Sequence, residues 1–167
     1  KGSSPNNNKR DNNTEDECPA SKKPGSSNEQ FLNHQPDGIR MIERELADQD
    51  EVWSRRNLVV PGNVQVIGKE AYRDFRGLVS VHFCGVGLQL IMQDAFFSCK
   101  MLSDLVLPIG LRSIGARAFR ECWNLSELSI PGTVVELGLS AFEGCISLND
   151  VQIHNGLCFI HGRAFYG

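Results

Sequence analysis

The sequence predicts an α/β repeat solenoid, in which each repeat contributes short parallel strands and a short helix. The main observation is an alanine followed by an aromatic residue, which recurs at spacings of 24, 23, 23 and 23 residues. These pairs are Ala71-Tyr72, Ala95-Phe96, Ala118-Phe119, Ala141-Phe142 and Ala164-Phe165. Self-similarity at a fixed period of about 20–50 residues is typical of repeat arrays, whose units stack along one axis.

Apolar residues also recur at fixed distances from each alanine, whereas the positions between them vary. The column four residues before the alanine contains Ile67, Ile91, Ile114, Leu137 and Ile160. The column four residues after it contains Phe75, Cys99, Cys122 and Cys145. A column that is apolar in every repeat indicates side chains that share one core, because a single repeat cannot bury its own apolar side. We therefore expect Phe96, Phe119 and Phe142 to be buried.

The spacing of apolar residues changes along one repeat. Leu125–Ile130 ends in a step of two residues, which is typical of a short strand, and Pro131-Gly132 then ends that strand. Val134–Leu137 indicates a second extended segment. The steps of one and three residues in Ala141–Cys145 place three apolar side chains on one side of a helix, so they predict a short helix here.

The repeat reads L-x-x-L-x-I-P-x-x-V-x-x-I-G-x-x-A-F-x-x-C, with Leu137 at its second isoleucine, and it resembles the BspA-type leucine-rich repeat. The resemblance covers about residues 57–167, as five units of which the last is truncated. It implies a right-handed curved solenoid with the strands on its concave face and short helices outside. Two units depart from the pattern. The second has Gly85 for proline and one extra residue near Cys84, and the fifth has His154 for proline and His161 for glycine.

Residues 1–36 are rich in Asn, Ser, Lys, Asp and Glu and contain few large apolar side chains, so they predict a disordered linker. Asn12-Asn13-Thr14 within this segment matches a glycosylation acceptor, although an asparagine-rich linker also produces this triplet by chance.

Residues 37–56 predict an amphipathic helix that caps the first repeat. Asp37 is a suitable N-cap residue. Ile39, Ile42 and Leu46 then lie on one face of the helix. The alternative role for this helix is the binding of a partner.

The composition and motifs indicate no nucleic-acid partner, no membrane-spanning segment and no catalytic or phosphate-binding site. The 167 residues carry a formal charge of −3, which does not indicate a nucleic-acid partner. No apolar run reaches the ~18 residues that cross a bilayer. Gly85-Val86-Gly87 lacks the third glycine of a phosphate-binding loop, and no nucleophile lies in a pattern with a base. We expect no enzyme activity and no cofactor. We also expect a monomer or a piece of a longer chain, the latter because residue 1 is Lys and the last unit is cut short.

The six cysteines predict a structural role. Cys99, Cys122 and Cys145 share one apolar column, where reduced thiols suit close packing; disulfides or thiol catalysis are the alternatives. Cys18 and Cys84 are expected to be the more accessible thiols. An intracellular protein would keep all of them reduced, and the sequence favours a cytoplasmic over an extracellular location only slightly.

His154, Cys158 and His161 have the spacing H-x3-C-x2-H, which is compatible with three zinc ligands. A fourth ligand is missing nearby, and both histidines stand in columns of turn residues. We therefore expect a degenerate last repeat and no metal site.

The outward-facing strand positions are the predicted binding surface: Ser80, His82, Asp104, Val106, Glu127, Ser129, Asp150 and Gln152. Asp104, Glu127 and Asp150 should stand in one row at the strand spacing of ~5 Å. This row is either a solvated face or a docking stripe for a basic protein partner. Trp123 and Ile146 of adjacent repeats are either an exposed apolar anchor or packed along the stack.

The sequence therefore predicts a non-enzymatic protein-interaction module that uses the concave face of a solenoid. The alternatives are a sensing or regulatory segment of a larger signalling protein or enzyme, and a fragment of a cell-surface adhesin.

Overall fold

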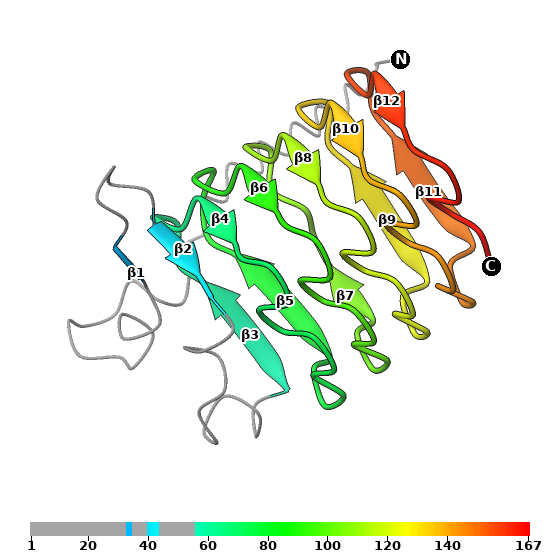
Figure 1. Ribbon diagram of the computed structural model, residues 1–167, viewed down its shortest axis with the longest axis horizontal. Coiled ribbons are helices and arrows are strands. Elements are labelled where there is room, and N and C mark those ends of the chain that lie inside the picture. Colours follow the sequence, from blue (N-terminus) through cyan, green and yellow to red (C-terminus); the bar gives the residue numbers. More distant parts are fainter. Residues whose placement is uncertain (1–32, 35–39, 44–55) are drawn as a thin grey trace, which may run out of the picture.

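The computed structural model describes residues 33–34, 40–43 and 56–167. These residues form a solenoid in which each turn of about 23 residues, here called a coil, stacks on the previous one. Figure 1 shows the coils side by side in chain order, from β2 at one end to β11 and β12 at the other. A solenoid of parallel strands, as the repeat spacing predicts, is thereby confirmed.

One side of the solenoid carries longer strands, which we call the long-strand row. It comprises β3 (Asn57–Val60), β5 (Ser80–Phe83), β7 (Asp104–Leu105), β9 (Glu127–Ile130) and β11 (Asp150–Ile153). All pairings are parallel, in one three-stranded sheet β3-β5-β7 and one two-stranded sheet β9-β11. The row is thus interrupted between β7 and β9. Along β9 the side chains alternate between exposed and buried, as a strand with one solvated face requires.

A second side carries shorter strands, the short-strand row. It comprises β2 (Arg40–Ile42), β4 (Val66–Ile67), β6 (Leu90–Ile91), β8 (Ser113–Ile114), β10 (Glu136–Leu137) and β12 (Phe159–Ile160). These six strands pair in parallel without interruption, and β1 (Asn33–His34) adds to β2 in antiparallel direction. This row is therefore a continuous sheet along the full described length of the solenoid.

The predicted outer helices are wrong: the part of the chain that the structure describes contains strands and turns but no helix. In the coil of Phe119, the N–H groups of Arg117, Phe119 and Glu121 donate to carbonyls of the following coil at 2.8–2.9 Å. The intervening N–H groups donate to the carbonyl three residues earlier. An α-helix would need every N–H to reach back four residues, so bonding to the next coil excludes it.

Backbone torsions agree with this bonding. Each turn of this third side, the turn row, places non-glycine residues in the left-handed region: Glu70, Asp74, Asp94, Ser98, Arg117, Glu121, Ser140 and Arg163. A right-handed helix cannot contain such residues. The alanine–aromatic spacing identifies the buried side of this segment correctly but does not reveal how its backbone hydrogen bonds are arranged.

The predicted N-terminal capping helix is wrong where the structure describes it. Arg40–Ile42 is strand β2, which pairs with Val66 and Ile67 of β4. The N–H groups of Gln65 and Gly68 donate to β2 carbonyls at 2.9 and 2.7 Å. A strand can satisfy this backbone edge of β4, whereas a helix cannot. The rest of the predicted helix lies outside the described residues.

The predicted disordered linker, residues 1–36, lies outside the described residues except for Asn33 and His34, which form β1. The glycosylation triplet at Asn12 lies outside them as well.

The core consists of the predicted columns. Phe96, Phe119 and Phe142 are buried, which confirms that the repeating aromatic residues point inward. Successive rings from Tyr72 to Phe165 stack with centroids 5.1–5.5 Å apart. The rings of Phe96, Phe119 and Phe142 are therefore covered on both sides by rings of the adjacent coils.

The predicted extra residue near Cys84 is confirmed. The second complete coil needs ten residues from the start of β5 to the start of β6, against nine from β9 to β10. Gly85 has φ 68°, so this wider turn uses the conformational freedom of glycine.

Candidate functional site

Three carboxylates follow one another across the long-strand row. Glu127 and Asp150 are opposite each other in the parallel pairing of β9 and β11. Asp104 begins β7, where it pairs with Ser80 of β5. We call Asp104, Glu127 and Asp150 the acidic row. All three are exposed, as their place in the repeat predicts.

The acidic row surrounds a hollow of about 230 Å³ at the interruption between β7 and β9. The hollow is lined by Ser103, Asp104, Leu105, Val106, Glu127, Leu128, Ser129, Asp150 and Gln152. Six of the eight predicted surface residues thus come together around it. The other two, Ser80 and His82, lie on β5 outside its lining, and the Ser80 hydroxyl donates to the Asn57 side chain at 2.9 Å.

The interruption of the long-strand row explains the hollow. At the start of β7, the N–H groups of Ser103 and Asp104 donate to the carbonyl of Val79 at 3.0 and 3.1 Å. The start of β11 repeats this arrangement on Ser126. At β9, among the described residues, the structure has no such bonds back to the coil of β7. The facing edges of β7 and β9 are therefore unpaired with each other, and the surface dips between them.

The acidic row carries uncompensated negative charge. Within residues 40–43 and 56–167, no Lys, Arg or His side chain forms an ion pair with Asp104, Glu127 or Asp150. Like charges at strand spacing repel each other, and water screens that repulsion. A cationic group placed over the row would relieve it.

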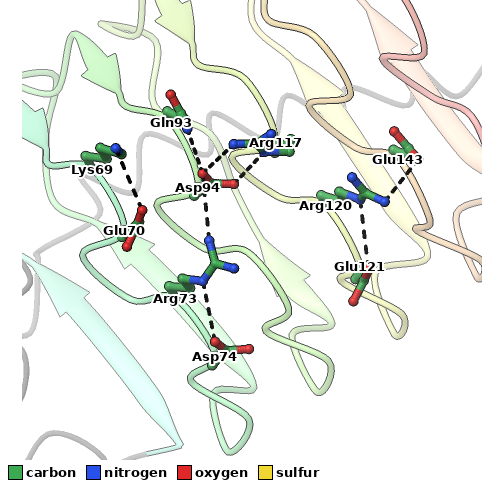
Figure 2. A network of polar contacts seen from close by, with 10 residues as sticks. All are labelled: Lys69, Glu70, Arg73, Asp74, Gln93, Asp94, Arg117, Arg120, Glu121 and Glu143. Atoms are coloured by element: carbon green, nitrogen blue, oxygen red, sulfur yellow. Dashed lines mark hydrogen bonds and ion pairs between the residues drawn. The ribbon is translucent and has the colours of Figure 1, made fainter.

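Charges on the turn row are arranged differently (Figure 2). Asp94 is buried, and its carboxylate accepts hydrogen bonds from Arg117 Nε and Nη2 at 2.8 and 2.9 Å. Gln93 Nε2 donates to the same carboxylate at 2.9 Å, and Arg73 Nη1 lies 3.8 Å from it. In the next coils, Arg120 Nη2 lies 3.3 Å from Glu143 Oε1. These acids are neutralised within the molecule.

Burial alone would raise the pKa of Asp94, but the hydrogen bonds from Arg117 and Gln93 and the charges of Arg117 and Arg73 outweigh it. The pKa of Asp94 therefore lies below its ordinary value, and the carboxylate is ionised at neutral pH. Sequence reasoning missed this group. The signal was present, because Asp94 and Arg117 stand one repeat apart in the same column and have opposite charges.

His154, Cys158 and His161 do not converge on one point. His154 Nε2 lies 3.2 Å from the Ser129 hydroxyl, and His161 Nε2 lies 2.8 Å from Glu136 Oε1. The Cys158 thiol faces the Gly156 carbonyl at 3.4 Å. Within the described ranges, no group of three His, Cys, Asp or Glu side chains could hold a metal ion.

Trp123 and Ile146 are both exposed. The Lys100 ammonium lies 3.7 Å from the centroid of the Trp123 ring, which is a cation–π contact between adjacent coils. One face of Trp123 is therefore covered by Lys100, whereas Ile146 is open to solvent.

The predicted ladder of reduced thiols is confirmed for Cys99, Cys122 and Cys145, which are free and buried. Each thiol lies 3.2–3.5 Å from a carbonyl oxygen of the preceding coil. Burial raises the pKa of all three, that of Cys145 to about 12, so these thiols are protonated and unreactive at neutral pH.

Cys84 differs from the prediction of an accessible free thiol. It is buried and disulfide-bonded, whereas Cys99, Cys122, Cys145 and Cys158 are free. Cys18 lies outside the described residues. In the described part of the chain, no helix is long and apolar enough to cross a membrane.

These features define the class of protein: a solenoid of parallel strands with a regular core and a polar, open strand face. Residues 51–167 match six copies of the BspA type leucine-rich repeat region. The chain belongs to this repeat family, and the match contains one copy more than the five units read from the sequence.

Solved structures of leucine-rich repeat proteins resemble the chain in fold. A leucine-rich cell surface protein from Faecalibacterium prausnitzii has a TM-score of 0.68 at 20% identity, over 81% of this chain and 44% of that chain. The pneumococcal vaccine antigen PcpA has a TM-score of 0.64 at 20% identity, over 82% of this chain and 35% of that chain.

A leucine-rich repeat protein from Bacteroides capillosus has a TM-score of 0.61 at 22% identity, over 74% of this chain and 92% of that chain. The chain thus spans less than half of the length of the Faecalibacterium prausnitzii protein. At such identities the likeness shows the fold alone. No curated protein matches the chain.

Proposed function

We propose that the solenoid is a non-enzymatic protein-interaction module whose long-strand row, the predicted concave face, binds a basic segment of a partner. The observation that carries the proposal is the acidic row, which lines a hollow and has no ion-pair partner among the described residues. Other acids of the solenoid, such as Asp94 and Glu143, have arginine partners. The contrast supports a row left free for an external cation.

The chemistry of the hollow fits Lys and Arg side chains. Carboxylates form charge-assisted hydrogen bonds with guanidinium groups, and Ser129 and Gln152 add neutral hydrogen-bonding groups beside them. Val106 adds an exposed apolar surface along which the methylene groups of such side chains can lie. The partner segment therefore combines positive charge with aliphatic stems.

The test is binding of an extended peptide with Arg at alternate positions, measured by calorimetry on the wild type and on Asp104→Ser/Glu127→Ser/Asp150→Ser. The wild type should bind this peptide and not its Glu counterpart, and the affinity should fall with salt because the contacts are exposed ion pairs. The triple variant should lose roughly tenfold or more of the affinity, which corresponds to about 1.4 kcal/mol.

A matched control is Asp74→Ser/Glu121→Ser/Glu136→Ser, which removes the same number of charges elsewhere. Ser98 occupies the same left-handed turn position as Asp74 and Glu121, so the chain tolerates serine there. This control should keep the wild-type affinity. If both variants lose the same affinity for the peptide, the loss comes from the change in net charge, and the acidic row is not a specific site.

A second candidate, a cell-surface role, is favoured by the disulfide at Cys84. Disulfides persist in oxidising compartments outside the cytosol. Two similar folds are a leucine-rich cell surface protein and a vaccine antigen. A thiol titration of protein purified without reductant and then denatured should give four reactive thiols, namely Cys99, Cys122, Cys145 and Cys158. Six reactive thiols would argue for a reducing compartment.

A further inference from the structure

Two turns that follow long strands carry exposed apolar residues where other coils have small or polar ones. Val86 is 61% exposed and Ile109 is 68% exposed. They occupy one column of the repeat, which contains Gly62, Gly132 and Asn155 in the other coils. The fold therefore does not require a large apolar side chain at this position, because these three coils turn without one.

The two turns are in direct contact. The turn of Val86 follows β5 and the turn of Ile109 follows β7, and these strands lie side by side (Figure 1). A Cβ atom on Gly110 would clash with the Val86 carbonyl oxygen, so the second turn packs closely on the first. The chain neighbours of both residues are glycine or proline. No charged side chain thus flanks this apolar pair in the sequence.

Val106 connects the pair to the hollow. It is 68% exposed and lines the hollow. In the same coil, Asp104 of the acidic row precedes it by two residues and Ile109 follows it by three. Its equivalent in the next coil is Ser129, so the fold does not require valine here either. We call Val86, Val106 and Ile109 the apolar corner. Along this coil the exposed surface changes from carboxylate to apolar within about 7 Å.

The other exposed apolar residue near the acidic row suits a basic partner less well. Trp123 precedes Glu127 by four residues, but the Lys100 ammonium lies 3.7 Å from the centroid of its ring. Arg76 and Lys100 also occupy the Trp123 column in the two preceding coils. Positive charge at this column repels Lys and Arg side chains of a partner, whereas the apolar corner is compatible with them.

We propose that the apolar corner determines which basic segment binds: an extended partner segment with an apolar residue two positions from its Lys or Arg. This inference rests on the proposed function, because the basic side chain lies in the hollow. Side chains two positions apart lie on the same face of an extended segment, about 7 Å apart. With the cation beside Asp104, the apolar side chain contacts Val106. A second apolar residue, two positions further, lies toward Val86 and Ile109.

The test is an NMR titration of the full chain with three nonapeptides of equal charge. The first, Leu-Ser-Leu-Ser-Arg-Ser-Leu-Ser-Leu, places Leu two and four positions from Arg in both chain directions. The second, Ser-Leu-Ser-Leu-Arg-Leu-Ser-Leu-Ser, has the same composition with Leu on the opposite face, and the third has Ser for every Leu. The first should bind roughly fivefold or more tightly than the others, because only its Leu side chains are buried on the corner. It should also shift the methyl signals of Val106 and Ile109.

The test variant is Val106→Ser/Ile109→Asn, which introduces the residues found at the equivalent positions Ser129 and Asn155. Because other coils contain these residues, the variant should fold like the wild type, which urea unfolding checks. It should bind the all-Ser peptide as the wild type does and lose the preference for the first peptide.

A matched control removes two exposed apolar residues elsewhere. Val135→Gln/Leu139→Ala changes side chains that are 38% and 52% exposed, and Gln89 and Ala116 stand at the equivalent positions of other coils. This control should keep the affinities of the wild type for all three peptides. A loss of the preference in the control would contradict a specific role of the apolar corner.

The outcomes separate this inference from the proposed function. Equal affinities of the wild type for the three peptides, or no binding of them while the peptide with Arg at alternate positions binds, would overturn this inference alone. No binding of any Arg peptide would overturn both. A wild type that sediments as a dimer and becomes monomeric on Val106→Ser/Ile109→Asn would also overturn it, since a second copy would then cover the corner.

Discussion

The first complete coil and the last coil have nearly the same inward residues and bury them to different extents. Ile67 in β4 and Ile160 in β12 occupy one column, yet the first is buried and the second is exposed. Tyr72 is buried, whereas the Phe165 ring at the other end is only partly covered. Burial in this fold is thus a property of the contact between two coils, because neither coil can cover its own apolar side.

The two ends also differ in how their backbone edges are satisfied. β2 covers the short-strand edge of the first coil, and β1 covers β2. At the other end, β11 and β12 are edge strands. Edge strands with exposed apolar residues pair readily with further strands. Substitutions at equivalent positions of the two ends should therefore have unequal effects on stability.

The largest difference is expected for a charge placed in the isoleucine column. Ile67→Asp would bury an unpaired carboxylate between β2 and β6 and should cost roughly 5 kcal/mol or more, enough to unfold the chain. Ile160→Asp should leave a folded protein, because that side chain is exposed. Circular dichroism and urea unfolding of both variants test this prediction. Equal losses of stability would contradict a difference between the two ends.

Truncation of a stacked ring should also cost more stability inside the solenoid than at its β11–β12 end. The losses should be smaller than that expected for Ile67→Asp. Phe119→Ala removes a buried ring between two neighbours and should cost about 3–5 kcal/mol. Phe165→Ala removes a ring that is covered on one side, so we expect roughly half of that loss. The measurement is the free energy of unfolding in urea, and a loss at Phe165 as large as that at Phe119 would contradict the comparison.

The Asp94–Arg117 pair predicts a pH-dependent difference. The pKa of Asp94 is lowered in the folded state, so its contribution is fully present above the unfolded-state value of about 3.9 and is lost as the pH falls through the folded-state pKa. Asp94→Asn should thus destabilise by about 1–3 kcal/mol at pH 7 and by progressively less below pH ~4.

Arg163→Gln is the matched control for that pair. Arg163 occupies the column of Arg117 in the last coil, where its guanidinium lies 5.7 Å from the Tyr166 ring. This variant should unfold like the wild type at every pH. A loss that is independent of pH for Asp94→Asn would show that the cost arises from packing rather than from charge.

The smallest effects are expected at the acidic row. Glu127→Ala and Asp150→Ala should each change the stability by no more than about ±0.5 kcal/mol, because both side chains are exposed and lack ion-pair partners in the described residues. Urea unfolding tests this expectation. A loss above 1 kcal/mol at Glu127 would mean that the row is structural.

The apolar columns allowed much of this architecture to be predicted. Side chains such as Leu128 and Phe119 recur because each coil covers the next, so their spacing reports burial directly. The turn row was misjudged, because the spacing of Ala141 and Cys145 is compatible with a helix as well as with linked turns. Only the hydrogen bonds to the next coil distinguish the two.

The candidate site was predictable in part. The exposed positions of β7, β9 and β11 follow from strand alternation, so Asp104, Glu127 and Asp150 could be placed in one row. The hollow between β7 and β9 could not be predicted, because Glu127–Ile130 fits the repeat pattern as well as any other strand. The strand at Arg40–Ile42 was missed because Ile39, Ile42 and Leu46 also fit a helical period.

The left-handed residues of the turn row restrict how this scaffold can be engineered. Positions such as Ser98, Glu121 and Ser140 have φ of 57–61°, a conformation that β-branched side chains adopt only with strain. A combinatorial library can therefore vary the outward residues of the long strands widely. At these turn positions it should be limited to glycine, asparagine, aspartate and the residues already present.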